Sequence, residues 1–246
     1  MSLIYPLLII NTYLLTISSS FTLTFVIKTV IFDLDGLLIN SEPLWHEAEK
    51  AAFKQVGINL THQMCLQNTG LRINEVVQVW YDAMPWQNKS TADVTNDVLD
   101  KLLLLIANQA TLMDGVVELL DFFGQMSLNL AVASSSPTKV IHAALAKFNL
   151  LDSFHAIFSA EYLPYGKPHP AVFLETAAFF HTPPNQCLVF EDSFNGLIAA
   201  KAARMKTIAV PEEAQFNETR FDIADFKLHS LAQFTPQHWQ ALQNLI

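Results

Sequence analysis

The chain of 246 residues is poor in cysteine and in basic residues, and each shortage excludes a class of protein. Its two cysteines, Cys65 and Cys187, offer neither a disulfide framework nor the ligand spacing of a zinc site, which suits a reducing compartment. There are 14 Lys and Arg residues against 23 Asp and Glu, so the formal net charge is −9. Because a nucleic-acid-binding protein needs a basic surface to displace counterions, we expect no nucleic-acid partner.

The first 27 residues lack charge altogether. They therefore lack the basic segment with which a signal peptide begins. Polar residues also interrupt the apolar run too often for a membrane-spanning helix, namely Asn11, Thr12, Thr16 and Ser18–Ser20. We interpret residues 1–25 as a leader outside the folded domain, and we expect a cytoplasmic protein without a membrane role.

From Val26 onward, short apolar runs alternate with helix-length stretches, and hydrophobic residues make up 51% of the chain. Five runs read as buried strands: Val26–Phe32, Leu128–Ala133, Ala156–Phe158, Cys187–Phe190 and Thr207–Val210. Three stretches between them carry an apolar stripe and helix-start residues: Pro137–Phe148, Pro170–Phe180 and Ser193–Met205. Strand followed by helix, repeated, predicts a doubly wound, Rossmann-like α/β domain with a parallel sheet.

Residues 43–112 break this alternation. Helical periodicity is present, with a long amphipathic stretch from Thr91 to Leu105, and no convincing strand. We interpret the segment as a helical cap inserted into the α/β domain. The predicted catalytic core then consists of residues 26–42 and 113–246, a size that one large core plus an accessory domain can fill.

Four polar clusters follow predicted strands: Asp33–Gly36, Ser134–Ser136, Lys167–Pro168 and Glu191–Asp192. Each alone has a structural explanation as a turn, a helix cap or a surface charge. However, the carboxyl ends of parallel strands share one edge of a sheet, so all four clusters should converge. Carboxylates that bind a hard cation, a hydroxyl cluster and a lysine together indicate phosphoryl transfer.

The segment Val30–Leu38 (VIFDLDGLL) resembles the first motif of the haloacid dehalogenase superfamily, and Ser134, Lys167 and Glu191–Asp192 resemble its other three motifs. Two longer stretches, Leu37–Pro43 and Glu191–Gly196, are similar to its β-phosphoglucomutase-like branch. Several further segments are closer to the bacterial hexitol and 2-deoxyglucose-6-phosphate phosphatases: Gly70–Ile73, Trp80–Tyr81, Pro85–Trp86, Lys167–Pro170 and Lys201–Met205.

This resemblance implies a Mg²⁺-dependent phosphatase acting on a small phosphate monoester, most simply a sugar phosphate. Asp33 would be the nucleophile that forms an aspartyl-phosphate, and Asp35 the general acid and base. Ser134, the backbone of Ser135 and Lys167 would hold phosphoryl oxygens. The Mg²⁺ ligands implied are Asp33, the main-chain carbonyl of Asp35, Asp192 and, directly or through a neighbour, Glu191.

Substrate selection is expected from the cap, where Arg72, His46 and Trp86 are the candidate contacts. Two positions depart from the pattern of the branch. Asn40 stands where an acid is usual, which leaves cap closure open, and Gly166 replaces a small polar residue, which we interpret as a loop variation of little consequence.

Two other functions share these motifs. A phosphoglucomutase-type mutase would use the same residues, and a phosphate-binding or signalling module could become phosphorylated on Asp33 without turnover. The sequence does not distinguish phosphatase from mutase and does not give the physiological substrate. We expect a monomer.

Overall fold

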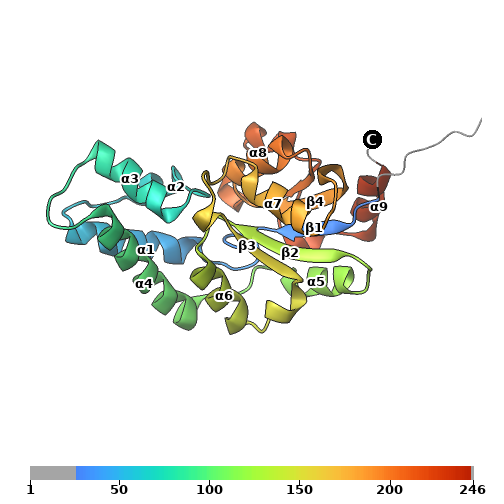
Figure 1. The fold of residues 1–246 in the computed structure, drawn as a ribbon, viewed down its shortest axis with the longest axis horizontal. Helices are drawn as coiled ribbons and strands as arrows, with labels where there is room; N and C mark the ends of the chain where they lie inside the picture. The colour runs from blue at the N-terminus through green and yellow to red at the C-terminus, as the bar shows by residue number, and fades with distance from the viewer. Residues whose placement is uncertain (1–25, 245–246) are drawn as a thin grey trace, which may run out of the picture.

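A six-stranded parallel sheet forms the centre of the larger of two lobes (Figure 1). The computed structural model describes residues 26–244, so the predicted leader at residues 1–25 lies outside the described residues. The strand order is β3-β2-β1-β4-β5-β6. The strands are β1 (Thr29–Phe32), β2 (Asn129–Ser134), β3 (Ala156–Ser159), β4 (Cys187–Glu191), β5 (Lys206–Ala209) and β6 (Phe226–Lys227). The predicted doubly wound α/β class is confirmed.

Helices cover both faces of the sheet. Alternate residues of each strand point to opposite sides, and in the central strands the residues on both sides are apolar and need a helix to bury them. In β1, Val30 and Phe32 pack with Phe123 and the other apolar residues of one cluster, whereas Ile31 packs with Phe173 in a second cluster. The helices of this lobe are α5 (Val116–Gly124), α6 (Thr138–Lys147), α7 (Ala171–Phe179), α8 (Phe194–Ala202) and α9 (Pro236–Asn244). Burial on both faces explains why the central strands read as continuous apolar runs.

The chain winds outward from β1 in both directions, so the order of the strands reverses between β1 and β4. These two strands pair in register, with Phe32 opposite Phe190. Their loops diverge at the carboxyl edge and leave a crevice there, which is where ligands bind in sheets of this type.

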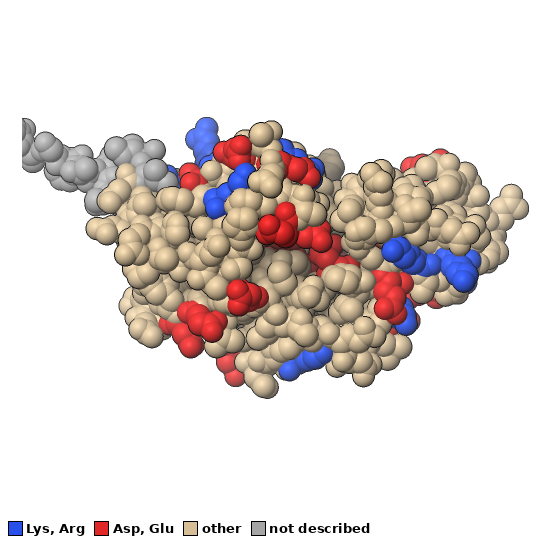
Figure 2. Space-filling model, turned by 180° about the vertical axis from the view of Figure 1, so that it is seen from behind, with Lys and Arg blue, Asp and Glu red and all other residues tan. Residues whose placement is uncertain are grey.

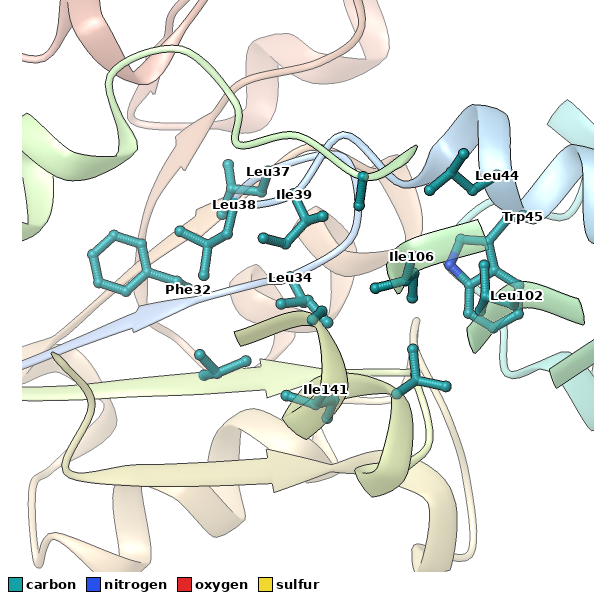
Figure 3. Packing of buried hydrophobic residues seen from close by; sticks show 14 of the residues in the cluster. Phe32, Leu34, Leu37, Leu38, Ile39, Leu44, Trp45, Leu102, Ile106 and Ile141 are labelled. Carbon is teal, nitrogen blue, oxygen red and sulfur yellow. The ribbon is translucent and has the colours of Figure 1, made fainter. Parts of the chain in front are cut away.

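The smaller lobe consists of four helices between β1 and α5 (Figure 1). They are α1 (Glu42–Gln55), α2 (His62–Leu66), α3 (Ile73–Ala83) and α4 (Thr91–Gln109). Ser90 and Asp93 form a capping box that begins α4, and the buried stripe of this helix includes Leu102 and Ile106. Figure 3 shows Leu102 and Ile106 facing Trp45 of α1, so these two helices share an apolar core.

The two connections between the lobes run side by side. Ile39, before α1, forms a β-bridge with Leu112, after α4. The amide of Asn40 donates to Thr111 O at 2.9 Å, and that of Met113 to Leu38 O at 3.0 Å. The side chains of Leu37, Leu38 and Ile39 pack beneath this junction (Figure 3). The chain therefore passes from the α/β lobe into the smaller lobe and back at one place.

Among the helices of residues 26–244, none combines the length and the hydropathy needed to cross a membrane.

Candidate active site

Asp33 lies directly after β1, where its amide donates to Phe190 O of the neighbouring strand. Its side chain is buried and accepts a hydrogen bond from Lys167 Nζ at 2.5 Å. The same amine donates to Glu191 Oε2 at 2.8 Å and to Ala133 O at 3.2 Å. Three of the predicted clusters thus meet at a single buried cation.

The charges of this group are unbalanced. Asp33, Glu191 and Asp192 each place a carboxylate oxygen within 4.8 Å of the others, against the one positive charge of Lys167. Burial raises the pKa of Asp192 well above its ordinary value, and the carboxylates of Glu191 and Asp33 add to the shift. Burial likewise raises the pKa of Asp33, although Lys167 opposes the shift. Burial alone would lower the pKa of Lys167, but Asp33 and Glu191 outweigh it and raise the pKa.

A group of buried oxygens with surplus negative charge fits a hard divalent cation. Both oxygens of Glu191 are already bonded within the protein, one to Lys167 and the other to the amide and hydroxyl of Ser193. Asp33 and Asp192 are therefore the carboxylates more available to a metal ion, and Glu191 holds Lys167 and the start of α8 in place.

Gly36 is required by the close approach of Asp192. It adopts a positive φ of 74°, and a Cβ at this position would lie 2.2 Å from Asp192 Oδ2. Any other residue would strain the backbone here and force the Asp192 carboxyl group to shift.

The serine cluster follows β2 and links the two lobes. Ser134 Oγ accepts from the amide of Ser136 at 3.0 Å. Ser135 Oγ donates to Gly70 O of the smaller lobe at 2.8 Å. All three serines line the same cavity as Asp33 and Lys167.

Asp35 lines this cavity and is held by three donors. Ser41 Oγ donates to Oδ1 at 2.6 Å, Trp45 Nε1 to Oδ1 at 2.8 Å, and Ser136 Oγ to Oδ2 at 2.5 Å. Serine hydroxyls can rotate and accept as well as donate, whereas an indole N–H can only donate. Trp45 and Ser41 therefore fix the carboxyl group through Oδ1, while Oδ2 faces the hydroxyl of Ser136, which can either donate or accept.

Among the three candidate contacts from the cap, the structure brings only His46 to the cavity. Burial lowers the pKa of His46 to about 4, helped by His62, whose ring lies edge-on at 5.0 Å. His46 is therefore neutral at physiological pH. Trp86 packs against Phe53 and Tyr81 instead, inside the smaller lobe.

Arg72 fastens one lobe to the other. Its guanidinium donates to Leu163 O at 2.7 Å and Ala160 O at 3.2 Å in the α/β lobe, and to Glu75 Oε1 at 2.6 Å. It does not line the cavity. Gly166 permits this arrangement, because a Cβ there would lie 2.9 Å from Arg72 Nε. The interpretation of Gly166 as a variation of little consequence is wrong.

Several residues of the site were not predicted from the sequence. Among those lining the cavity are Glu42, Trp45, Glu49, Cys65 and Asn68. Trp45 and Glu49 are separated by one helical turn of α1, and this spacing is the only sequence signal that could have indicated a shared face. Figure 2 shows Asp and Glu side chains gathered along the hollow between the two lobes. The cleft there is lined in part by Glu42, Asp192, Glu212 and Glu213.

Residues 30–210 match the profile of the haloacid dehalogenase-like hydrolases, and the chain belongs to this family. The predicted family is therefore confirmed, and the chain is an enzyme of the hydrolase class.

The chain is 43% identical over 210 residues to hexitol phosphatase B of Escherichia coli strain K12, covering 85% of this chain and 95% of the relative. Among solved structures it is similar to CbbY from Rhodobacter sphaeroides in complex with phosphate, with a TM-score of 0.77 and 24% identity over 84% of this chain and 96% of the other. β-Phosphoglucomutase from Clostridium difficile has a TM-score of 0.77 and 21% identity, over 89% and 97% of the two chains. These two structures share the fold of this chain.

Proposed function

We propose that the protein is a magnesium-dependent phosphatase that releases phosphate from a small sugar or sugar-alcohol phosphate through an aspartyl-phosphate intermediate. The observation that carries this proposal is that two acids close in the chain, Asp33 and Asp35, have different hydrogen-bond partners. Asp33 is bonded to Lys167, whereas Asp35 is held apart by Ser41, Trp45 and Ser136. Two carboxyl groups in different surroundings can take different roles in one reaction.

In the first step, a carboxylate oxygen of Asp33 attacks phosphorus, and the bond between phosphorus and the leaving alcohol oxygen breaks. Asp35 supplies the proton that the leaving oxygen needs. In the second step, water attacks the phosphorus of the aspartyl-phosphate and gives its proton to Asp35. The Asp33–phosphorus bond breaks, inorganic phosphate leaves, and both acids return to their starting states.

The neighbouring residues balance charge during these steps. The amine of Lys167 lies against Asp33 and can bond to a phosphoryl oxygen. Ser134 Oγ and the backbone of Ser135 border the same cavity and offer further polar contacts. The residues proposed to hold Mg²⁺ are Asp33, Asp192 and the main-chain carbonyl of Asp35, with Glu191 behind them. When bound, the ion would offset the charge of the carboxylates and of the phosphate dianion.

Sugar and sugar-alcohol phosphates are proposed as substrates for two reasons. The relative with 43% identity is named a hexitol phosphatase. In addition, the smaller lobe closes over the cavity through Ser135–Gly70 and Arg72–Leu163, which leaves access to a small molecule and excludes a polymer chain. The acidic hollow of Figure 2 also disfavours anionic polymers. We further propose a monomer in the cytoplasm, where the free thiols of Cys65 and Cys187 would stay reduced.

The test is phosphate release from a panel that contains hexitol 6-phosphates, hexose phosphates, nucleoside monophosphates and p-nitrophenyl phosphate. We expect hexitol and hexose phosphates to give the highest kcat/KM. Asp33→Asn should abolish release from every substrate, because the amide is a poor nucleophile. A preference for nucleoside monophosphates, or full activity of Asp33→Asn, would contradict the proposal. Conversion of glucose 1-phosphate to glucose 6-phosphate without phosphate release would show a mutase.

A further inference from the structure

The end of the active-site cavity that lies in the smaller lobe carries buried polar groups that the phosphoryl chemistry does not use. Glu49 projects from α1 and is 7% exposed, and Asn68 lies in the loop between α2 and α3 and is 9% exposed. Both line the cavity that contains Asp33 and Lys167. Glu49 Oε2 and Asn68 Nδ2 have no hydrogen-bond partner.

Unpaired buried polar atoms are few within residues 26–244, and they are not scattered evenly. Six side-chain atoms are of this kind, and three of them belong to residues lining this one cavity: Glu49 Oε2, Asn68 Nδ2 and Thr69 Oγ1. Burying a polar group without a partner is unfavourable, so native proteins rarely keep several together. Such a cluster indicates a surface built to bond a ligand.

The chemistry of the cluster matches hydroxyl groups. The amide of Asn68 donates, the hydroxyl of Thr69 both donates and accepts, and a carboxyl group such as Glu49 accepts when ionised and also donates when protonated. Burial raises the pKa of Glu49 to about 7, although the Cys65 thiol and Lys50 oppose the shift. Each hydroxyl of a polyol is both donor and acceptor, and it can pair with any of these groups.

The charges of the cavity disfavour a second phosphate at this end. Among the described residues that line it, Lys167 is the only Lys or Arg, and it is already bonded to Asp33 and Glu191. His46 is neutral, as described above. A second phosphate dianion would therefore lie beside the Glu49 carboxyl group with no Lys or Arg of the cavity lining free to offset its charge.

We propose that Glu49 and Asn68 form a hydroxyl-binding subsite that selects monophosphates with an uncharged, polyhydroxylated leaving group and rejects substrates that carry a second phosphate. The inference rests on the proposed function, because it requires the reacting phosphate to lie against Asp33. It also bears on the mutase alternative. A phosphorylated mutase must accept a sugar monophosphate whose own phosphate lies at the far end of the cavity, where this chain places Glu49.

The experiment compares kcat/KM for three compounds: glucitol 6-phosphate, glucitol 1,6-bisphosphate and p-nitrophenyl phosphate. The first two differ only in the second phosphate. We expect the wild-type enzyme to prefer the monophosphate by at least about tenfold, the factor that corresponds to one modest interaction. Glu49→Gln and Asn68→Ser should each lower kcat/KM for glucitol 6-phosphate about tenfold relative to p-nitrophenyl phosphate. Glu49→Gln, which removes the charge, should also narrow the preference over the bisphosphate.

Glu47→Gln is the matched control. Glu47 lies on the same helix, is exposed, and pairs with Lys101 at 3.2 Å outside the cavity. This variant should have the wild-type kcat/KM for all three compounds. Thermal unfolding of each variant would show that it is folded.

Two results would overturn the inference. One is an equal loss on all three compounds in the folded Glu49→Gln and Asn68→Ser variants, which would make both residues structural. The other is a wild-type enzyme that hydrolyses the bisphosphate as well as the monophosphate. Either result would refute the subsite and would still agree with the proposed function as a sugar phosphatase. A wild-type enzyme that hydrolyses none of the three would instead refute the proposed function and the subsite with it.

Discussion

The indole nitrogen of Trp45 donates a hydrogen bond of 2.8 Å to Oδ1 of Asp35, ten residues earlier in the chain. Trp45 belongs to α1, the first helix of the smaller lobe, whereas Asp35 belongs to the loop after β1. The position of the proposed acid and base therefore depends on the placement of the smaller lobe. This contact links substrate enclosure to proton transfer.

Trp45→Phe should lower kcat about fivefold with little change in KM, because it removes one hydrogen bond of about 1 kcal/mol from Asp35 and leaves the cavity apolar at that point. Trp80→Phe is the matched control, because Trp80 is a buried tryptophan of α3 whose Nε1 has no partner. Similar kinetics for both variants would mean that Trp45 only fills space.

Arg72→Ala should lower kcat/KM by the same factor for a hexitol phosphate and for p-nitrophenyl phosphate. Its guanidinium bonds Ala160 O and Leu163 O and does not contact the cavity, so its loss should loosen the closure of the smaller lobe for every substrate. Thermal or urea unfolding should show a loss of about 2 kcal/mol, typical of hydrogen bonds from a buried charged group. A loss confined to the hexitol phosphate would instead assign Arg72 to substrate binding.

Lys167→Met should abolish turnover and lower the free energy of unfolding by about 3–5 kcal/mol, because Asp33 and Glu191 would remain buried without their cation. Adding Glu191→Gln to this variant should recover part of the stability and none of the activity. Lys139→Met, at an exposed lysine, should change neither. Urea unfolding and phosphate release measure the two effects, and a stable Lys167→Met protein would contradict the role given to this amine.

Exhaustive chelation should abolish phosphate release, and Mg²⁺ should restore it. Mg²⁺ at 100 times its Kd should stabilise the folded protein by about 2.7 kcal/mol, visible as a rise in Tm. Asp192→Asn should reduce this rise, whereas Asp100→Asn, at an exposed acid, should keep it. Turnover that survives chelation would refute the metal site, and an unchanged rise in Asp192→Asn would remove Asp192 from it.

The stability of the protein should depend on pH through Glu49, whose pKa is raised by burial from its ordinary value to about 7. Between the two values the unfolded chain has lost this proton and the folded protein keeps it. Glu49 therefore favours folding less as pH rises from about 4.5 to about 7. Relative to Glu49→Gln, the wild type should lose about 2 kcal/mol between pH 5 and pH 8. Tm measured at both pH values tests this, and parallel curves for the two proteins would contradict it.

The sequence was sufficient where the signal is local. The strand before Asp33 and the strands before Ser134 and Glu191 are apolar runs buried on both faces, and parallel pairing brings their ends together. Strand β6 was missed because two residues, Phe226 and Lys227, are too few to form a pattern. The strand predicted at Val26–Phe32 is shorter in the structure, where β1 begins three residues later, at Thr29.

The contacts between the lobes could not be predicted in this way. Arg72 has the charge and the hydrogen-bond donors expected of a residue that binds substrate. However, its guanidinium donates to two carbonyls that lie about 90 residues away in the chain. Glu49 reads as one of several polar residues on an amphipathic helix. Its burial depends on how α1 packs against α2, whose Cys65 thiol contacts Glu49, and periodicity does not encode that packing.

The pairing of Ile39 with Leu112 has a consequence for the order of folding. β1 must pair with β2 across about 100 residues of chain, as Thr29 and Asn129 show, and such distant contacts form slowly. The hydrogen bonds within each of the helices α1 to α4 are local, and all four helices, including the packed pair α1 and α4, lie wholly within that interval. Once these helices fold and Ile39 pairs with Leu112, the roughly 70 residues between them no longer add to the length of the flexible loop that joins β1 to β2. The loop between β1 and β2 then shortens about fourfold, since the segments from Asp33 to Ile39 and from Leu112 to Leu128 remain, and two halvings lower the entropic cost of joining these strands by about 1.2 kcal/mol. The segment that encloses the substrate thus also brings the neighbouring strands β1 and β2 together.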